Sequence, residues 1–225
     1  MSTTKFLLAA VAAAAVTLPA RGEVNFWDEG TPEKTVTYGA RVGLNVSSLG
    51  GDFDWDSKAG LQLGAAVDWH LINSISINTG LYFTMKGAKA NYTEIDVDGS
   101  NYFYNSAYHR LTYNALEIPV YVNYHFTVAP ESTVQVFFGP YFDLGVYGRE
   151  LLKYNIGNKE IQESASLFGG DEGGCNRFNV GVGLGAAYTW HRCQVALSYQ
   201  WGCTHAAKEY DGSWNNFAIT LGYNF

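Results

Sequence analysis

The last eleven residues of the chain, NNFAITLGYNF (215–225), alternate between apolar residues and polar or small ones. Phe217, Ile219, Leu221, Tyr223 and Phe225 would share one face of a β-strand, because successive side chains of a strand point to opposite sides. The same period of two recurs in residues 35–47, 59–71, 75–86, 114–126, 133–148, 177–190 and 192–203. The pattern therefore predicts about eight strands.

The lengths of these segments and of their connections indicate strands that cross a membrane. Each predicted strand has roughly 11–14 residues, against about 5–6 in ordinary sheets and about 9–11 for a strand that crosses a bilayer. Short connections at 72–74, 127–132 and 191–192 alternate with long ones at 48–58, 87–113, 149–176 and 204–214. Short periplasmic turns alternate with long outer loops in bacterial outer-membrane barrels. The first strand is therefore expected to start in the periplasm, where the C-terminus also returns.

The residues on the opposite strand face separate this fold from a soluble lipocalin, whose apolar side chains would point inward. That face carries charges, amides and many glycines, which suit a lumen that side chains must fill. Its charged members are Arg41, Asp68, Lys86, Glu117, Asp143 and Arg192. Aromatic residues also gather at both ends of the strands, as in interfacial girdles. We predict an all-β, eight-stranded antiparallel up-and-down transmembrane β-barrel over residues 35–225.

Composition and the N-terminus agree with export to the outer membrane of a Gram-negative bacterium. The 225 residues are 16% aromatic and 16% charged, with 25 glycines, and the mean hydropathy of −0.10 is too low for a helical membrane protein. Lys5 and the apolar run 6–16 predict a signal peptide over residues 1–20. Residues 21–34 then form a periplasmic segment. The net charge of −7 argues against nucleic acid as a partner.

Several stretches resemble the PorT-like family of outer-membrane β-barrels and, more distantly, the small OmpX-like barrels. These are YNALEIPVYVNYHF (113–126), FFGPYFDLGVYG (137–148), FNVGVGLGAAY (178–188), VALSYQWG (195–202) and the tail. The Leu-Glu-Ile-Pro segment and the Gly-Pro strand that follows it are the more specific of these. The resemblance implies a barrel without catalytic residues to assign, in a family with one branch linked to protein secretion.

The sequence contains only weak signals for a catalytic or metal-binding site. His70, His109, His125, His191 and His205 lack the spacing of metal ligands, so packed histidines are expected rather than a metal site. Ser106 and His109 share an outer loop and leave a lipid hydrolase as a minor alternative. We therefore predict neither an enzyme nor a cofactor.

The charges on the inward face balance three against three, and buried charges must be paired. From the rise along a tilted strand, Arg41 could reach Asp68 or Glu117. A two-hydrogen-bond pair with Glu117 is the preferred prediction. Such a network would plug the lumen.

Two further pairs of residues lead to predictions about local geometry. Pro119 and Pro140 lie about equally far from the turn at 127–132, and each lacks an N–H for the ladder, so they should meet within about one rung at a local break. Cys175 and Cys203 lie at the outer ends of adjacent strands and could form a disulfide, which would leave Cys193 unpaired.

The outer loop at 89–108 contains strand-forming residues around Asp98-Gly99, a strong hairpin signal. We predict a β-hairpin that projects beyond the membrane, and its tyrosines suit a recognition surface. They are Tyr92, Tyr102, Tyr104 and Tyr108. The predicted role is structure, adhesion or recognition through the outer loops, in contact with outer-membrane lipid and lipopolysaccharide and with surface proteins or glycans. A small-solute pore, a lipid-modifying enzyme and a secretion-accessory barrel are the alternatives.

Overall fold

The computed structural model describes residues 26–51, 54–98, 101–156, 159–168, 174–207 and 211–225. These residues form nine antiparallel strands. The strands are β1 (Val36–Leu49), β2 (Asp56–Ile72), β3 (Ile75–Asp98), β4 (Asn101–Ala129), β5 (Ser132–Ile156), β6 (Lys159–Ser166), β7 (Phe178–Trp190), β8 (Cys193–Gly202) and β9 (Trp214–Asn224). No helix in this described part is long and apolar enough to cross a membrane.

Eight of the strands close into a ring. The order β4-β3-β2-β1-β9-β8-β7-β5 is completed by pairing of β4 with β5, and β6 is attached to β5 outside the ring. This confirms the predicted eight-stranded antiparallel barrel, in which neighbours in the sequence are neighbours in space. Closure gives every strand in the ring two partners, as hydrocarbon requires of a spanning sheet.

The short connections lie together at one end of the barrel. The turns follow Ile72, Ala129 and Trp190, as predicted from the alternating connection lengths. Two turn residues adopt a positive φ, Glu131 at 57° and His191 at 56°. These residues also join their turns, because His191 Nε2 lies 2.6 Å from a carboxylate oxygen of Glu131.

The two faces of the wall confirm the predicted alternation. Lipid-facing Leu44 and Leu63 are 65% and 63% exposed, whereas the inward Glu117 and Asp143 are each 1% exposed. Exposed aromatic residues end the strands at both rims. Trp69, Trp190, Tyr223 and Phe225 form the periplasmic girdle, and Phe83, Phe178 and Trp201 belong to the outer girdle.

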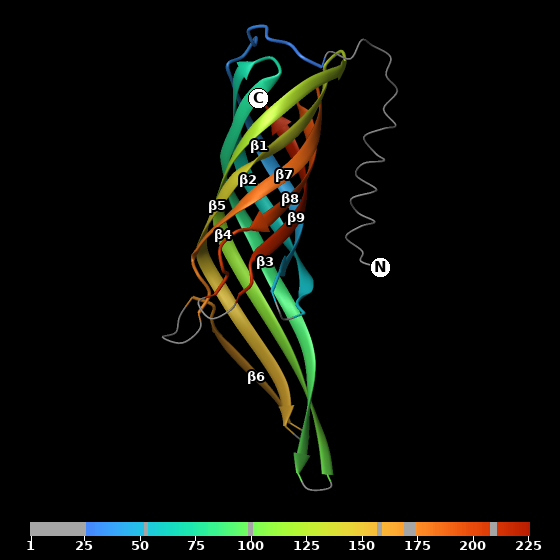
Figure 1. Cartoon of the computed structure of the whole chain (residues 1–225), viewed down its shortest axis with the longest axis vertical. Coiled ribbons are helices and arrows are strands. Elements are labelled where there is room, and N and C mark those ends of the chain that lie inside the picture. The colour runs from blue at the N-terminus through green and yellow to red at the C-terminus, as the bar shows by residue number, and fades with distance from the viewer. Residues whose placement is uncertain (1–25, 52–53, 99–100, 157–158, 169–173, 208–210) are drawn as a thin grey trace.

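Beyond the outer girdle, three barrel strands continue and β6 joins them. The pairing of β3 with β4 runs out to Asp98 and Asn101, which confirms the predicted hairpin at 89–108. β4 pairs with β5 as far as Ala107 and Tyr154, and β5 pairs with β6. We call these four strand segments the projecting sheet; they extend well past the barrel in Figure 1.

The third outer connection differs from its prediction as a plain loop over 149–176. β5 pairs with β7 only up to Leu144 and Phe178, and from Arg149 onward it pairs with β6 instead. The chain then turns back into the barrel mouth at Leu167 and Phe168. Gly145 and Gly148 allow this return, because a β-carbon at Gly145 would lie 2.5 Å from the Phe168 ring and one at Gly148 would lie 2.6 Å from Leu167.

The prediction for the two prolines is confirmed. Pro119 pairs with Tyr141, the neighbour of Pro140, and the ladder resumes only at Val122 and Phe138. The register is the same on both sides of the gap, so this is a local break without a bulge. Pro119 is buried and Pro140 exposed, as expected from their opposite parity.

The segment before β1 is fastened to the periplasmic rim. Asp28 N donates to Ser74 Oγ at 2.7 Å, and Ser74 N donates to Asp28 O at 3.1 Å. Trp27 stacks on Tyr124, with ring centroids 6.1 Å apart. Residues 26–30 therefore hold the turn between β2 and β3. The signal peptide predicted over 1–20 lies outside the described residues.

Candidate functional site

The centre of the lumen holds a buried cation between two carboxylates. Lys86 Nζ lies 2.7 Å from Asp143 Oδ2 and 3.0 Å from Glu117 Oε2. It also lies 4.7 Å from the centroid of the Tyr141 ring. We call Lys86, Glu117 and Asp143 the Lys86 cluster. It brings together inward positions of β3, β4 and β5 that the sequence had placed on one face.

Amide side chains continue this network across the barrel. Gln200 Nε2 of β8 donates to Glu117 Oε1 at 2.7 Å, and Asn216 Nδ2 of β9 donates to Gln200 Oε1 at 3.0 Å. Gln200 also donates to the Tyr121 hydroxyl at 3.2 Å. The network therefore ties opposite walls of the barrel together.

Arg41 belongs to a second group, nearer the periplasm. Its Nη2 lies 4.0 Å from Asp68 Oδ2 and donates to Asn224 Oδ1 at 2.6 Å. Asp68 Oδ1 accepts from Asn78 and Asn123, both at 2.9 Å. The predicted Arg41–Glu117 pair is wrong, because Glu117 is held by Lys86.

Arg192 does not join the lumen network, so that prediction is also wrong. The sequence pattern placed it on the inward face of a strand beginning at residue 192. β8 begins instead at Cys193, and Arg192 is exposed in the two-residue turn. A turn residue has no fixed face, so the alternation could not assign this side chain.

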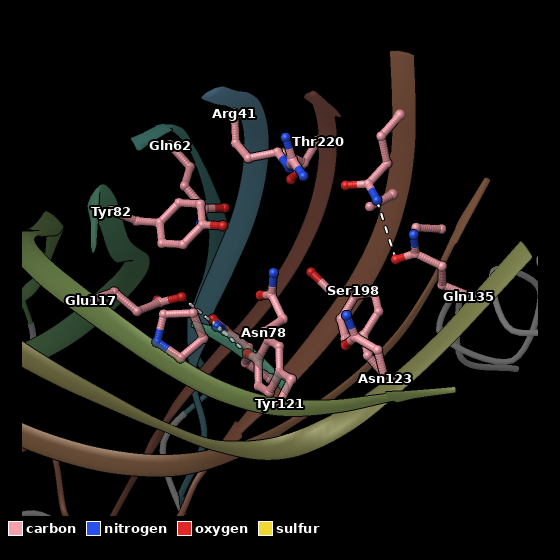
Figure 2. Close-up of a pocket in the computed structure, with 16 residues that line it drawn as sticks. Arg41, Gln62, Asn78, Tyr82, Glu117, Tyr121, Asn123, Gln135, Ser198 and Thr220 are labelled. Carbon is pink, nitrogen blue, oxygen red and sulfur yellow. Dashed lines mark hydrogen bonds between the residues drawn. The ribbon is translucent and has the colours of Figure 1, made fainter. Parts of the chain in front are cut away.

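A polar cavity of about 70 Å³ lies between the two charge groups. Arg41, Gln62, Tyr82, Glu117, Tyr121 and Gln194 are among the residues that line it, and Figure 2 shows several of these side chains converging from different strands. At about 10–15 Å³ for each buried water, it has room for only a handful. Its contents would be water rather than an organic solute.

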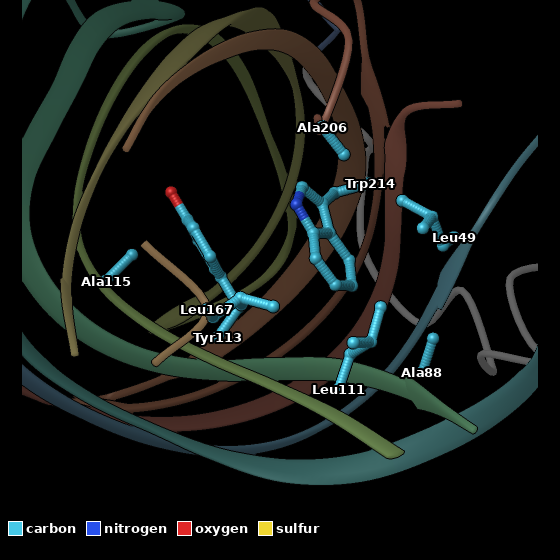
Figure 3. Close-up of a cluster of buried hydrophobic side chains, with 8 residues drawn as sticks. All are labelled: Leu49, Ala88, Leu111, Tyr113, Ala115, Leu167, Ala206 and Trp214. Carbon is cyan, nitrogen blue, oxygen red and sulfur yellow. The ribbon is translucent and has the colours of Figure 1, made fainter. Parts of the chain in front are cut away.

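An apolar cluster fills the outer mouth of the barrel (Figure 3). Trp214 stacks on Tyr113 with centroids 5.4 Å apart, and Phe168 meets Tyr113 at 5.6 Å. The buried members, here called the mouth cluster, are Leu49, Ala88, Leu111, Tyr113, Ala115, Leu167, Ala206 and Trp214. Sequence reasoning missed it, because Leu167, Ala206 and Trp214 lie in or next to segments read as loops.

The predicted disulfide is absent, and Cys175, Cys193 and Cys203 are all free. Cys175 packs against the mouth cluster, where burial raises the pKa of its thiol to about 12. Cys203 is exposed. One side chain therefore points into the mouth and the other away from it, so the neighbouring positions of the two residues do not bring their sulfurs together.

The tyrosines predicted for recognition lie on the projecting sheet. Tyr92, Tyr102 and Tyr104 occupy paired positions of the β3–β4 hairpin, and their side chains lie outside the described residues. Tyr108 also occupies a paired position there, opposite Asn91. Near it, His109 Nε2 lies 2.6 Å from Glu150 Oε1, and this hydrogen bond lowers the pKa of the Glu150 carboxyl.

His70 and His125 are packed inside the barrel, whereas His191 and His205 are exposed. His70 and His125 lie at the periplasmic end of the lumen with ring centroids 5.3 Å apart, and His125 Nε2 is 2.7 Å from Ser76 Oγ. Within the described ranges, no group of three or more His, Cys, Asp or Glu residues is placed to hold a metal ion. His109, the candidate member of a hydrolase pair, contacts Glu150; the side chain of Ser106 lies outside the described residues.

A closed antiparallel ring with an apolar outer face, two aromatic girdles and a polar interior defines a bacterial outer-membrane β-barrel. Residues 24–207 match the family model of the outer membrane protein beta-barrel domain. The chain belongs to this family, and it is an outer-membrane protein of a Gram-negative bacterium.

The chain is also similar to solved barrels. They include Ail, the attachment invasion locus protein of Yersinia pestis (12% identity, TM-score 0.40), the Neisserial surface protein A (11%, 0.43) and a major outer membrane protein of Thermus thermophilus (12%, 0.47). Each comparison covers 85% of this chain and 100% of the other. No curated protein sequence matches the chain.

Proposed function

We propose that this protein is a closed barrel that carries the projecting sheet at the cell surface for adhesion or recognition. It would bind surface proteins or glycans through that sheet and would neither conduct solutes nor catalyse a reaction. Within its family, the stretches at 113–126 and 137–148 support placing it with the PorT-like barrels.

The observation that carries the proposal is the extension of β3, β4 and β5 beyond the membrane. Strands of about 9–11 residues suffice to cross a bilayer, yet these three have 24, 29 and 25 residues. Their outer halves form ordered backbone pairs with one another and with β6. A rigid surface far from the membrane serves binding better than it serves transport.

The interior supports the second half of the proposal. The Lys86 cluster and its amide partners occupy the centre of the lumen, and the mouth cluster lies beyond them. A solute would have to displace both a buried ion network and packed aromatic rings. We therefore expect no steady single-channel conductance from the pure protein in planar bilayers, and such conductance would favour the pore instead.

Removing the hairpin tests the binding role. Replacing residues 92–107 by Asn-Gly keeps the pair Asn91–Tyr108 and closes it with a favoured two-residue turn. Cells displaying the wild-type chain should bind members of an array of extracellular matrix proteins and glycans, and the shortened chain should lose that binding. Equal binding by both chains would contradict the proposal.

Two controls make this result interpretable. The shortened chain should retain heat-modifiable mobility on gels, which reports a folded barrel. A second variant, Asp98→Asn, should behave as wild type, because it changes one side chain beside the turn and keeps the paired sheet.

A further inference from the structure

Three cations gather where β2, β3 and β4 leave the membrane. Lys89 of β3 and Arg110 of β4 are directly opposite in the ladder, and Lys89 lies six residues beyond the lipid-facing Phe83, so the two cations share the outward face. Like charges at directly opposite positions destabilise a sheet. This placement is unusual in a chain with a net charge of −7.

Lys58 of β2 completes the group. Its side chain lies over the backbone of Gly87, since a β-carbon added there would be 2.7 Å from Lys58 Cδ and 3.0 Å from Nζ. That β-carbon would point to the same side as Lys89, two residues along β3. The Lys58 ammonium therefore lies on the face that carries Lys89 and Arg110.

An irregularity in β2 accounts for this placement of Lys58. The register between β2 and β3 shifts between Ser57 and Gln62, and Ser57 is opposite the buried Ala88. Since successive residues of a strand alternate between faces, Lys58 lies on the other face of β3 from Ala88. A regular alternation along β2 would turn Lys58 inward. The register shift places it on the outward face of β3 instead.

None of the three has a counterion among the described residues. Lys58 is only 6% exposed, and within that part of the chain no carboxylate lies within ion-pair distance of Lys58, Lys89 or Arg110. Asp56 is opposite Lys89 in the ladder, but it is exposed and forms no such pair. Burial and the charges of Arg110 and Lys89 lower the pKa of Lys58 to about 8. Three cations this close repel one another, and an anion bound between them would offset that repulsion.

We propose that Lys58, Lys89 and Arg110 form a binding site for an anionic phosphoryl group of an outer-leaflet lipid. Arg binds phosphate oxygens through paired hydrogen bonds and Lys binds them as a point charge. This site is separate from the recognition role proposed for the tip of the projecting sheet.

The position of the site favours a lipid over a soluble anion. Phe83 of the outer girdle lies four residues before Gly87 and six before Lys89 on β3. The site therefore lies beyond the lipid-facing belt, on the outward face of the barrel. At this height the phosphorylated headgroups of the outer leaflet surround the barrel.

The test measures lipid binding to the full-length folded barrel by native mass spectrometry from detergent. The probes are diphosphoryl lipid A and, as a lipid without phosphate, monoglucosyl diacylglycerol. Diphosphoryl lipid A should bind the wild type, and Lys58→Gln and Arg110→Gln should each weaken binding about tenfold, the value of one charge-assisted hydrogen bond. The lipid without phosphate should bind weakly and equally to all variants.

Lys153→Gln is the matched control, because Lys153 lies on the same sheet but is paired with Glu160 at 3.3 Å; it should bind as wild type. Titration with inorganic phosphate and with a heparin hexasaccharide distinguishes a soluble source of the anion. Tighter, Lys58-dependent binding of either one than of diphosphoryl lipid A would overturn the assignment to lipid. Unchanged lipid binding in both Lys58→Gln and Arg110→Gln would overturn the site itself.

Discussion

At the scale of single residues, Lys86 is paired with two carboxylates that the fold has taken out of water. An isolated charge in such a site is expensive, and removing one partner of a buried ion pair is more harmful than replacing the whole group. Glu117 and Asp143 each contact Lys86 at 3.0 Å or less. These two close pairs offset part of the cost of burying the two carboxylates.

Lys86→Met should lower the free energy of unfolding in detergent by about 3–5 kcal/mol, because it leaves both carboxylates unpaired. The triple variant Lys86→Met, Glu117→Gln, Asp143→Asn removes all three charges and should recover most of the loss. Urea titrations followed by tryptophan fluorescence measure both. A single variant as stable as wild type would mean that the cluster contributes nothing to stability.

The lowered pKa of Lys58 predicts that the stability of the folded protein depends on pH. The pKa of this lysine falls from its ordinary value of 10.5 to about 8 in the folded protein, so the unfolded chain binds more protons between those values. Stability should therefore rise as the pH increases from about 8 to 10.5. In Lys58→Met this rise should disappear, which unfolding midpoints measured across that range in lipid A-free detergent will show.

At the scale of elements, the strands owe their position in the membrane to one exposed apolar face. Leu184 of β7 is 43% exposed between the two girdles, while its neighbours Gly183 and Gly185 face the lumen. The alternation of residues along each strand therefore also determines at which positions a charged substitution would destabilise the barrel in a bilayer.

Leu184→Arg should destabilise the barrel by about 2–4 kcal/mol, the cost of a charge near the bilayer midplane. Gln194→Arg, in the neighbouring strand but facing the lumen, is the comparison and should cost less. Folding into lipid vesicles, measured by gel mobility against urea concentration, gives both values. A Leu184→Arg chain that folds as well as wild type would contradict the assigned faces.

At the scale of the whole molecule, the barrel interior is filled by large side chains that lie over glycines of nearby strands. A β-carbon at Gly183 would lie 2.4 Å from the Tyr121 hydroxyl, and one at Gly185 would lie 2.3 Å from Phe137 Cζ. The contacts cross from β7 to β4 and β5. The glycines therefore make room for aromatic rings from other strands.

Gly183→Val should consequently destabilise the barrel by about 1–3 kcal/mol through overpacking. Adding Tyr121→Ala removes the ring that the new side chain meets, and the double variant should lose less stability than the two single changes together. A double-mutant cycle from thermal unfolding in detergent measures this coupling. Additive losses would show that the two residues do not share space.

Much of this architecture was readable from the chain, because alternation with a period of two is a property of each strand alone. Local patterns predicted the eight barrel strands, their inward and outward faces, the short turns and the β3–β4 hairpin, whereas β6 was missed. The prolines at 119 and 140 could be aligned by counting from one turn.

Only the tertiary structure shows which side chains meet across the barrel. Alternation places Arg41, Lys86 and Glu117 on one face, but stagger between strands determines that Lys86, not Arg41, reaches Glu117. Residues at the ends of strands have no periodicity to follow, so Arg192 lies in a turn and Cys175 points into the mouth. Closure of the sheet brings together the distant segments of the mouth cluster. The register shift between β2 and β3 decides that Lys58 lies beside Lys89 and Arg110.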